Sequence, residues 1–138
     1  MYIGEFHHQL DEKNRLRVPA KLRKKLGKGY IVTKGTNNCL FVFPREEFQS
    51  GLIDKFKNET LLNEDAKKPV RLVLSSAFEV EEDKQGRFVL PKSLKKYAFI
   101  NKDLVFLGMG NYLEIWSKEK WNEYTSSRDF TPNVFKRI

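Results

Sequence analysis

The fold is decided by DEKNRLRVPAKLRKK at residues 11–25, a stretch that occurs again as DKQGRFVLPKSLKKY at residues 83–97. The two stretches align without a gap on the shared pattern D-x-x-x-R-apolar-x-apolar-P-x-x-L. The match resumes downstream, where IVTKGTNNCLFVFPREEF at 31–48 aligns with LVFLGMGNYLEIWSKEKW at 104–121. Self-similarity at a fixed offset is the signature of a repeat architecture, so the chain is a tandem duplication.

Each copy, of about 40 residues, is too small to sustain a hydrophobic core of its own. We therefore expect the two copies to complete one another in one compact α+β unit that spans residues 1–138, a pseudo-dimer with a pseudo-twofold axis. A polar stretch without a counterpart in the other copy separates them. The predicted division is a first repeat at approximately 1–56, a connection at 57–69, a second repeat at approximately 70–125 and a C-terminal tail at 126–138.

The order of elements within one copy follows from its turn residues and prolines. We predict a strand that ends near Asp11, a tight turn over 12–14 and a second strand through 16–18. A short helix begins at Pro19, because proline suits the first helical turn. The second copy repeats this order.

Two apolar runs follow at 30–33 and 39–43, and the KGTNN between them favours a hairpin turn. Pro44 opens the next helix. The connection at 57–69 is expected to be partly helical. In the tail, Thr131 is expected to cap one further helix.

The composition indicates a folded protein with a polyanionic partner. Hydrophobic residues make up 40% of the chain and aromatic residues 13%, and the net charge is +8. Residues 11–28 hold eight basic residues against two acidic ones, and residues 83–100 hold five against one. The positive charge is therefore concentrated at the two copies of the motif, as expected of a nucleic-acid-binding surface.

The turn of each copy is the candidate binding site. Asn14 and Gly86 precede the two motif arginines, and Asn and Gly are the residues that best tolerate a positive φ. A tight turn at each place would project Lys13, Arg15 and Arg17 from the first copy and Lys84, Gln85 and Arg87 from the second. Arginine can fork onto the O6 and N7 atoms of guanine, while lysines and turn amides can hold phosphates.

A structural role for the same residues is the alternative. Each Asp and Arg, opposite one another across a hairpin, would form an ion pair worth about 0.2 to 1 kcal/mol when exposed. We assign that role, support of the turn, to Asp11 and Asp83. We assign binding to the arginines, because an ion pair does not require the surrounding surplus of basic residues. The lysines at 24, 25, 95 and 96 are expected to form a solvated helix face that adds nonspecific attraction.

Other kinds of site are not supported. His7 and His8 are adjacent on a strand and point to opposite faces, so they cannot chelate one metal ion. Cys39 has no second cysteine to pair with. No nucleophile or general-base motif accompanies the two aspartates, so no enzyme, no cofactor and no small-molecule substrate is expected. The chain also lacks a membrane span and a signal peptide, which predicts a cytoplasmic protein.

The sequence resembles the MraZ family of bacterial transcriptional regulators, within the AbrB-like superfamily. The resemblance rests on YIGEF near the N-terminus, on both motifs DEKNRLRVP and DKQGRFVLP with their spacing, and on the LEIW segment. It implies a swapped-hairpin β-barrel with peripheral helices, built from the two repeats, and self-assembly into a ring-shaped homo-oligomer. It also implies binding to direct repeats in double-stranded DNA upstream of the division and cell-wall gene cluster, usually as a repressor on the nucleoid.

The resemblance also ranks the candidate residues. The family's DNA-contacting role falls first on Arg15 and Arg87, and then on Lys13, Asn14, Lys84, Gln85 and Gly86. Arg17 is included on its charge alone, because the second copy has Val89 there. Asn14 departs from the family's usual Gly before the arginine, although Asn also tolerates the turn. An RNA-binding or antitoxin-like interaction module remains the alternative function.

Overall fold

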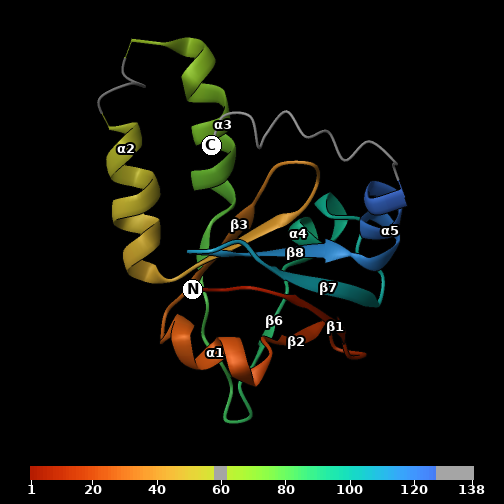
Figure 1. The fold of residues 1–138 in the computed structure, drawn as a ribbon. Helices are drawn as coiled ribbons and strands as arrows, with labels where there is room; N and C mark the ends of the chain where they lie inside the picture. Colours follow the sequence, from red (N-terminus) through yellow and green to blue (C-terminus); the bar gives the residue numbers. More distant parts are fainter. Residues whose placement is uncertain (58–61, 127–138) are drawn as a thin grey trace.

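The computed structural model describes residues 1–57 and 62–126, and these form an α+β fold of antiparallel sheets with several helices (Figure 1). The elements of the first half are β1 (Glu5–Gln9), β2 (Arg15–Arg17), α1 (Ala20–Leu26), β3 (Ile31–Lys34), β4 (Leu40–Phe43), a π-helical stretch (Glu47–Ile53) and α2 (Asp54–Phe56). Those of the second half are α3 (Glu64–Ser76), β5 (Phe78–Glu79), β6 (Arg87–Val89), α4 (Lys92–Tyr97), β7 (Asp103–Gly108), β8 (Leu113–Ser117) and α5 (Lys118–Ser126).

The element order predicted for one copy is confirmed in both halves. Helices α1 and α4 begin directly after Pro19 and Pro91, whose φ angles of −49° and −57° suit the approach to a helix. The apolar runs pair as the expected hairpin of β3 and β4. The turn of that hairpin contains Asn37 and Asn38 at positive φ. The next helical segment begins just after Pro44, as predicted.

The main sheet interleaves strands from the two halves. Its six strands run in the order β1-β7-β8-β4-β3-β5, and every neighbouring pair is antiparallel. The contacts β1 with β7, β8 with β4 and β3 with β5 each join a strand of one half to a strand of the other. Neither half therefore has a complete sheet without its partner.

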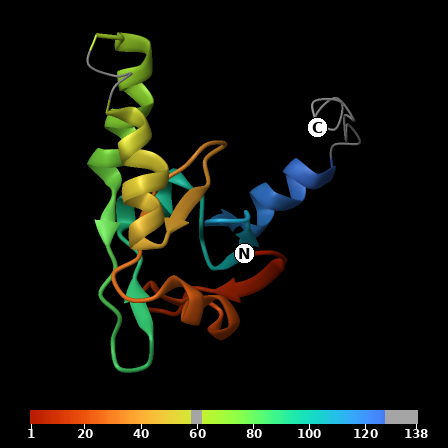
Figure 2. The same ribbon diagram turned by 60° about the vertical axis from the view of Figure 1, so that its left-hand side comes forward.

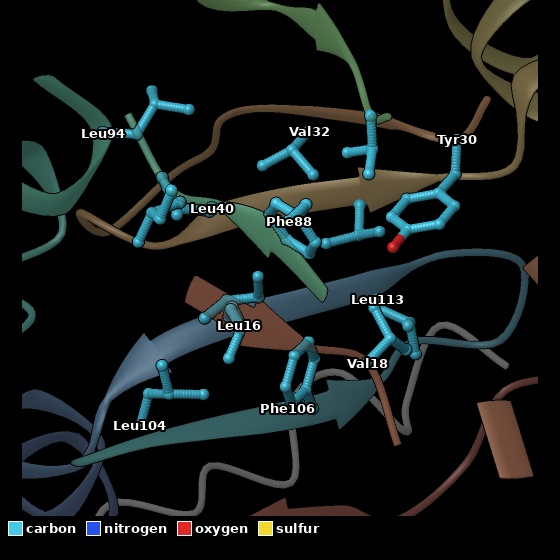
Figure 3. Close-up of a cluster of buried hydrophobic side chains, with 14 of the residues drawn as sticks. Leu16, Val18, Tyr30, Val32, Leu40, Phe88, Leu94, Leu104, Phe106 and Leu113 are labelled. Carbon is cyan, nitrogen blue, oxygen red and sulfur yellow. The ribbon is translucent and has the colours of Figure 1, made fainter. Parts of the chain in front are cut away.

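A two-stranded ribbon of β2 and β6 forms the second sheet and again joins the halves. Leu16 lies opposite Phe88 in this ribbon, and the two side chains are 1% and 3% exposed. Figure 3 shows both of them among core side chains of the main sheet, including Val32 and Leu113. The main hydrophobic core thus lies between the ribbon and the six-stranded sheet.

A second, smaller core covers the other face of the main sheet. Val105, Leu107 and Trp116 point to this face together with the buried Cys39. The ring of Trp121, from α5, packs edge-on against Trp116 with 5.3 Å between the ring centroids. Helix α5 is therefore fixed to the sheet by its aromatic side chains.

A helical hairpin of α2 and α3 projects from the sheet, at the opposite end of the molecule from the loop between β5 and β6 (Figures 1 and 2). Helix α3 begins at the N-cap Asn63, whose side chain accepts hydrogen bonds from the backbone N–H groups of Asp65 and Ala66. The expected connection at 57–69 is thus partly helical. The helix continues beyond it to Ser76, into residues that the sequence assigned to the second repeat.

Two expectations about the strands need correction. The strands on either side of each turn do not pair with one another as a hairpin, because β1 pairs with β7 and β2 pairs with β6. The pairing within residues 1–57 and 62–126 also leaves the main sheet open, with β1 and β5 at its edges, so a closed barrel is not observed. The helix expected at Thr131 lies outside the described residues.

Candidate nucleic-acid interface

The first turn is organised around the carboxylate of Asp11. Its Oδ1 accepts hydrogen bonds from the backbone N–H groups of Lys13 at 2.9 Å and Arg15 at 2.8 Å. Its Oδ2 accepts a hydrogen bond from Arg15 Nε at 2.6 Å. The backbone closes the turn, because Asp11 N–H donates to Arg15 O at 3.1 Å.

The second turn repeats this arrangement atom for atom. Asp83 Oδ1 accepts from the N–H groups of Gln85 and Arg87, each at 2.9 Å, and Oδ2 accepts from Arg87 Nε at 2.9 Å. Asp83 N–H donates to Arg87 O at 2.7 Å. The repeated sequence motif therefore forms the same local structure twice.

The residue before each arginine adopts the backbone conformation expected from the sequence. Asn14 has a φ of 58° and Gly86 a φ of 79°. This left-handed conformation is open to Gly and tolerated by Asn, whereas most other residues would be strained in it. The substitution of Asn for Gly in the first motif therefore preserves the turn.

The hydrogen bonds keep both aspartates ionised. At Asp11, desolvation opposes ionisation, but the bonds from the backbone and side chain of Arg15 and from Lys13 N–H outweigh it and lower the pKa of the carboxyl group. At Asp83, the backbone N–H of Arg87 is the largest of the contributions that lower the pKa. Each turn thus contains a fixed negative charge that attracts its own arginine.

Each motif arginine uses Nε for its aspartate, and this leaves its forked end available. Among the residues that the structure describes, neither terminal nitrogen of Arg15 or Arg87 has a hydrogen-bond partner. The side chains are 27% and 28% exposed. An arginine held at Nε presents two parallel N–H donors in a defined orientation, which is the geometry that bidentate recognition needs.

The ribbon of β2 and β6 brings the arginines of both turns onto one face. Because Leu16 and Phe88 point into the core, the residues that alternate with them face outward. Arg17 lies directly opposite Arg87. Arg15 is the diagonal neighbour of Arg87, a relation that places the two residues roughly 7–8 Å apart.

The outward face continues into a shallow hollow beside β1. Its lining residues come from β1, the first turn and the ribbon: His8, Gln9, Asp11, Arg15, Arg17 and Arg87. Burial lowers the pKa of His8, and the nearby positive charge of Arg17 lowers it further. His8 and Gln9 were not predicted as site residues, because nothing in their local sequence pattern shows that β1 lies next to the ribbon.

The remaining candidate residues lie at the exposed edges of the site. Lys13, Lys84 and Gln85 are exposed on the turns. Arg17 is also exposed and has no acidic partner within the described part of the chain. These side chains surround the arginines with positive charge and hydrogen-bond donors.

Two further cations lie against the turns, a position that was not predicted for either of them from the sequence. Arg23 contacts the second turn from α1, and Lys95 contacts the first turn from α4. The prediction of a solvated face is therefore wrong for Lys95, although Lys24, Lys25 and Lys96 are exposed as expected. The only sequence feature that could have indicated their role is that Arg23 and Lys95 occupy equivalent positions in the two copies.

Sites of other kinds find no support in residues 1–57 and 62–126. His7 is exposed on β1 and pairs with Glu5, whereas His8 is half-buried beside Phe106, as expected for neighbours on a strand. Cys39 is buried, and burial raises the pKa of its thiol. No group of metal-binding side chains is found there, and no helix is long and apolar enough to cross a membrane.

A family model described as "MraZ protein, putative antitoxin-like" matches the chain twice, at residues 1–71 and 73–133. The chain belongs to the MraZ family. Its relatives include proteins named transcriptional regulator MraZ from Clostridium beijerinckii, 52% identical over 127 residues, and from Clostridium tetani, 48% identical over 127 residues. Both alignments cover 92% of this chain and 89% of the relative.

A third relative, also named transcriptional regulator MraZ, comes from Carboxydothermus hydrogenoformans. It is 46% identical over 124 residues, which cover 90% of this chain and 86% of the relative. The MraZ family is one of transcriptional regulators, and family membership thus agrees with the expectation that the chain is not an enzyme.

Proposed function

We propose that the protein is a sequence-specific transcriptional regulator that binds double-stranded DNA through its two Asp–Arg turns and the ribbon between them. The observation that carries the proposal is the orientation of Arg15 and Arg87, each held at Nε with its forked end unengaged. The names of the relatives point to the same function.

The size and charge of the ribbon fit the major groove of DNA. That groove, about 12 Å wide, admits a two-stranded β-ribbon. The outward face of β2 and β6 presents three arginines and no acidic residue at its paired positions. A separation of roughly 7–8 Å between Arg15 and Arg87 corresponds to about two base-pair steps of 3.4 Å, so the two side chains would contact nearby base pairs.

The residues have distinct roles in this proposal. Arg15 and Arg87 contact guanine edges, and Arg17 adds a third cation beside them. The exposed side chains of Lys13, Lys84 and Gln85 hold phosphates and set the register. Asn14 and Gly86 contribute through the conformation of the turns, because their backbone N–H groups already donate to Asp11 O and Asp83 O. Asp11 and Asp83 orient the arginines and shape the turns. They are not assigned a contact with DNA, because a carboxylate would repel phosphate.

The architecture suggests how affinity would be reached. The exchange of strands between the halves supports a swapped-hairpin pseudo-dimer, which presents two turns in each subunit. Two small turns offer few contacts, and a ring-shaped homo-oligomer would place several pairs of turns against successive direct repeats, so that avidity supplies the affinity. Repression would follow from occlusion of the promoter upstream of the division and cell-wall genes, on the nucleoid in the cytoplasm.

The proposal is tested by titrating the protein with its own upstream DNA and with a duplex whose repeats are scrambled, across a series of salt concentrations. Arg15→Ala and Arg87→Ala should remove the preference for the intact repeats. Lys24→Ala, which removes an exposed charge outside the turns, should weaken binding to both duplexes by the same factor. Each lost phosphate contact flattens the log–log salt slope by about 0.9, which distinguishes backbone contacts from base contacts.

If both arginine variants retain the full preference while they stay folded and oligomeric, the turns are structural and do not recognise DNA. The regulatory part is tested separately by deletion of the gene, which should raise expression of the downstream cluster if the protein is a repressor.

An antitoxin-like interaction module, or an RNA-binding one, is the second candidate. The description of the family model as antitoxin-like favours it. In that case a toxin would copurify with the protein, or single-stranded RNA would compete with duplex DNA for the turns.

A further inference from the structure

The first turn is held by a side chain from the other half of the chain. Lys95 Nζ, on α4, donates a hydrogen bond to the side-chain Oδ1 of Asn14 at 2.9 Å. The backbone O of Asn14 also accepts a hydrogen bond from Leu90 N–H at 2.9 Å. The residue that gives the first turn its positive φ is thus bound on both sides by the second half.

The second turn is held in the corresponding way from the first half. A Cβ atom on Gly86 would lie 2.4 Å from Cζ of Arg23, so the guanidinium of this α1 residue lies against the turn backbone. Arg23 is itself fixed by Glu82, which accepts from Nε at 2.8 Å and from a terminal nitrogen at 2.9 Å. Tyr30 donates a further hydrogen bond to Glu82 at 2.8 Å.

The two contacts are equivalent under the internal repeat. Arg23 and Lys95 occupy the same position of the two copies, and so do Asn14 and Gly86. The two contacts differ in chemistry. The ammonium group of Lys95 donates a hydrogen bond to the side-chain oxygen of Asn14, whereas the guanidinium of Arg23 packs against Gly86, which has no side chain. Asn in place of Gly before Arg15 therefore provides the acceptor that a lysine needs.

We propose that Arg23 and Lys95 are positioning residues of the DNA interface and form a reciprocal clamp, in which the helix of each half holds the turn of the other. The inference rests on the proposed function of the turns. A clamp of this kind fixes the two turns, and hence Arg15 and Arg87, relative to one another before DNA arrives. Preorganisation lowers the entropy lost on binding and sharpens the preference for one spacing of contacts.

Burial separates these two cations from their neighbours on the same helices. Arg23 and Lys95 are half-buried, whereas Lys24 and Lys96 are exposed. Lys24 and Lys96 carry the same charge on the same helices but do not contact the turns. Their substitution therefore removes the electrostatic attraction of one charge to DNA and leaves the clamp intact. They are therefore matched controls.

The first test compares Lys95→Met with Lys96→Met in binding to the intact and scrambled duplexes. Both variants lose one positive charge from α4. Lys96→Met should weaken binding to both duplexes by the same factor. Lys95→Met should in addition reduce the ratio of the two affinities roughly tenfold, the order expected for the loss of one hydrogen bond to a charged group. Lys95→Arg keeps a donor and should restore most of the ratio.

A double-mutant cycle identifies the route of the effect. Asn14→Gly keeps the positive φ but removes the oxygen that Lys95 binds. In this background Lys95→Met should no longer lower the affinity ratio, because the interaction is already absent. Arg23→Met against Lys24→Met is the corresponding comparison for the second turn.

Hydrogen exchange of the free protein supplies a readout that does not involve DNA. The backbone N–H groups of Lys13 and Arg15, bonded to Asp11, should exchange faster in Lys95→Met than in Lys96→Met. The clamp is overturned if the two variants match in both exchange and affinity ratio. If exchange accelerates but Arg15→Ala still prefers the intact repeats, the clamp stands as a structural feature and the proposed function of the turns fails.

Discussion

The residue before each turn arginine combines a backbone requirement with a packing requirement. Asn14 and Gly86 both have positive φ, but their surroundings differ. Asn14 has its side-chain oxygen bonded to Lys95, whereas Gly86 has Arg23 where a side chain would begin. The two positions are therefore equivalent in conformation and not interchangeable in packing.

Gly86→Ala should consequently destabilise the protein more than alanine at a glycine with positive φ in open space. Gly110, with a φ of 88° and nothing within 4 Å of the place that a Cβ atom would take, is the matched control. Gly110→Ala should cost about 1–2 kcal/mol from the left-handed backbone alone. Gly86→Ala should cost at least about 1 kcal/mol more, because its methyl group must displace Arg23 from Glu82. Urea denaturation measures both, and equal losses would contradict the contact with Arg23.

His8 should make folding depend on pH near neutrality. Burial and Arg17 lower its pKa from the ordinary value of 6.5, so the folded protein disfavours the protonated ring. Below pH 6.5 the unfolded chain then binds a proton that the folded chain does not, and stability falls with pH until the lowered pKa is reached. The lowered pKa values of Asp11, Asp83 and Glu82 act in a separate, more acidic window, below their ordinary values of 3.8 to 4.5.

The measurement is the free energy of unfolding of the wild type and of His8→Gln between about pH 5 and 8. The wild type should lose stability as the pH falls through 6.5, and the variant should lose less. Parallel curves for the two proteins would show that His8 does not disfavour its charge in the folded state.

The sequence predicted those site residues whose contacts are local. Asp11 and Arg15 are four residues apart, and Asn14 lies between them, so a short motif contains the whole turn. Arg23, Lys95 and His8 act across the halves, over separations that no local pattern encodes. Only the equivalence of Arg23 and Lys95 in the repeat could have suggested that both have a role.

At the scale of elements, α3 is the largest addition to the duplicated plan, and it docks through a few polar contacts at its C-terminal end. The hydroxyl group of the fully buried Thr33, on β3, donates to Val73 O and bonds the hydroxyl of Ser76 at 2.9 Å. Ser76 Oγ also accepts from Lys34 N–H at 3.2 Å. No residue of α3 itself is buried, so these bonds carry much of its attachment.

Thr33→Val should therefore loosen α3 while the rest of the fold is retained. The substitution keeps the shape of the side chain and removes the hydroxyl group, which leaves buried partners unsatisfied at a cost of about 1–3 kcal/mol. In the Thr33→Val variant, native-state hydrogen exchange should be faster in α3 than in the wild type and unchanged in the main sheet. Thr33→Ser, which keeps the hydroxyl group, should retain slow exchange in α3. If Thr33→Val exchanges like the wild type, other contacts hold the helix.

The elements themselves were largely predictable, and their pairing was not. Prolines, turn residues and apolar runs act locally, and they marked the same order of strands and helices in both copies. Strand pairing depends on which apolar faces meet, so the sequence did not show that β1 leaves its own turn to join β7. The length of α3 was underestimated, because this helix has no counterpart in the other copy and contains Pro69.

At the scale of the whole molecule, the alternation of halves makes the two copies one cooperative unit. The contacts β1 with β7, β4 with β8, β3 with β5 and β2 with β6 all cross between the halves. Loss of either half would expose the edges of the remaining strands and would expose the main core to solvent, because both halves contribute its residues. Both turns, and any site built on them, therefore form or disappear together.

Leu16→Ala tests this cooperativity by comparing a probe that lies only in the second half with one that reports on the whole chain. Leu16 is 1% exposed in the main core, so its truncation should cost about 2–5 kcal/mol. The chain has two tryptophans, Trp116 and Trp121, and both lie in the second half. Because the halves unfold as one, the urea midpoint from tryptophan fluorescence should fall by the same amount as the midpoint from far-UV circular dichroism. Phe88→Ala, the facing truncation in the second half, should behave alike. A fluorescence midpoint that stays at the wild-type value while circular dichroism shows an earlier transition would mean that the first half unfolds alone and that the interleaved strands do not couple the repeats.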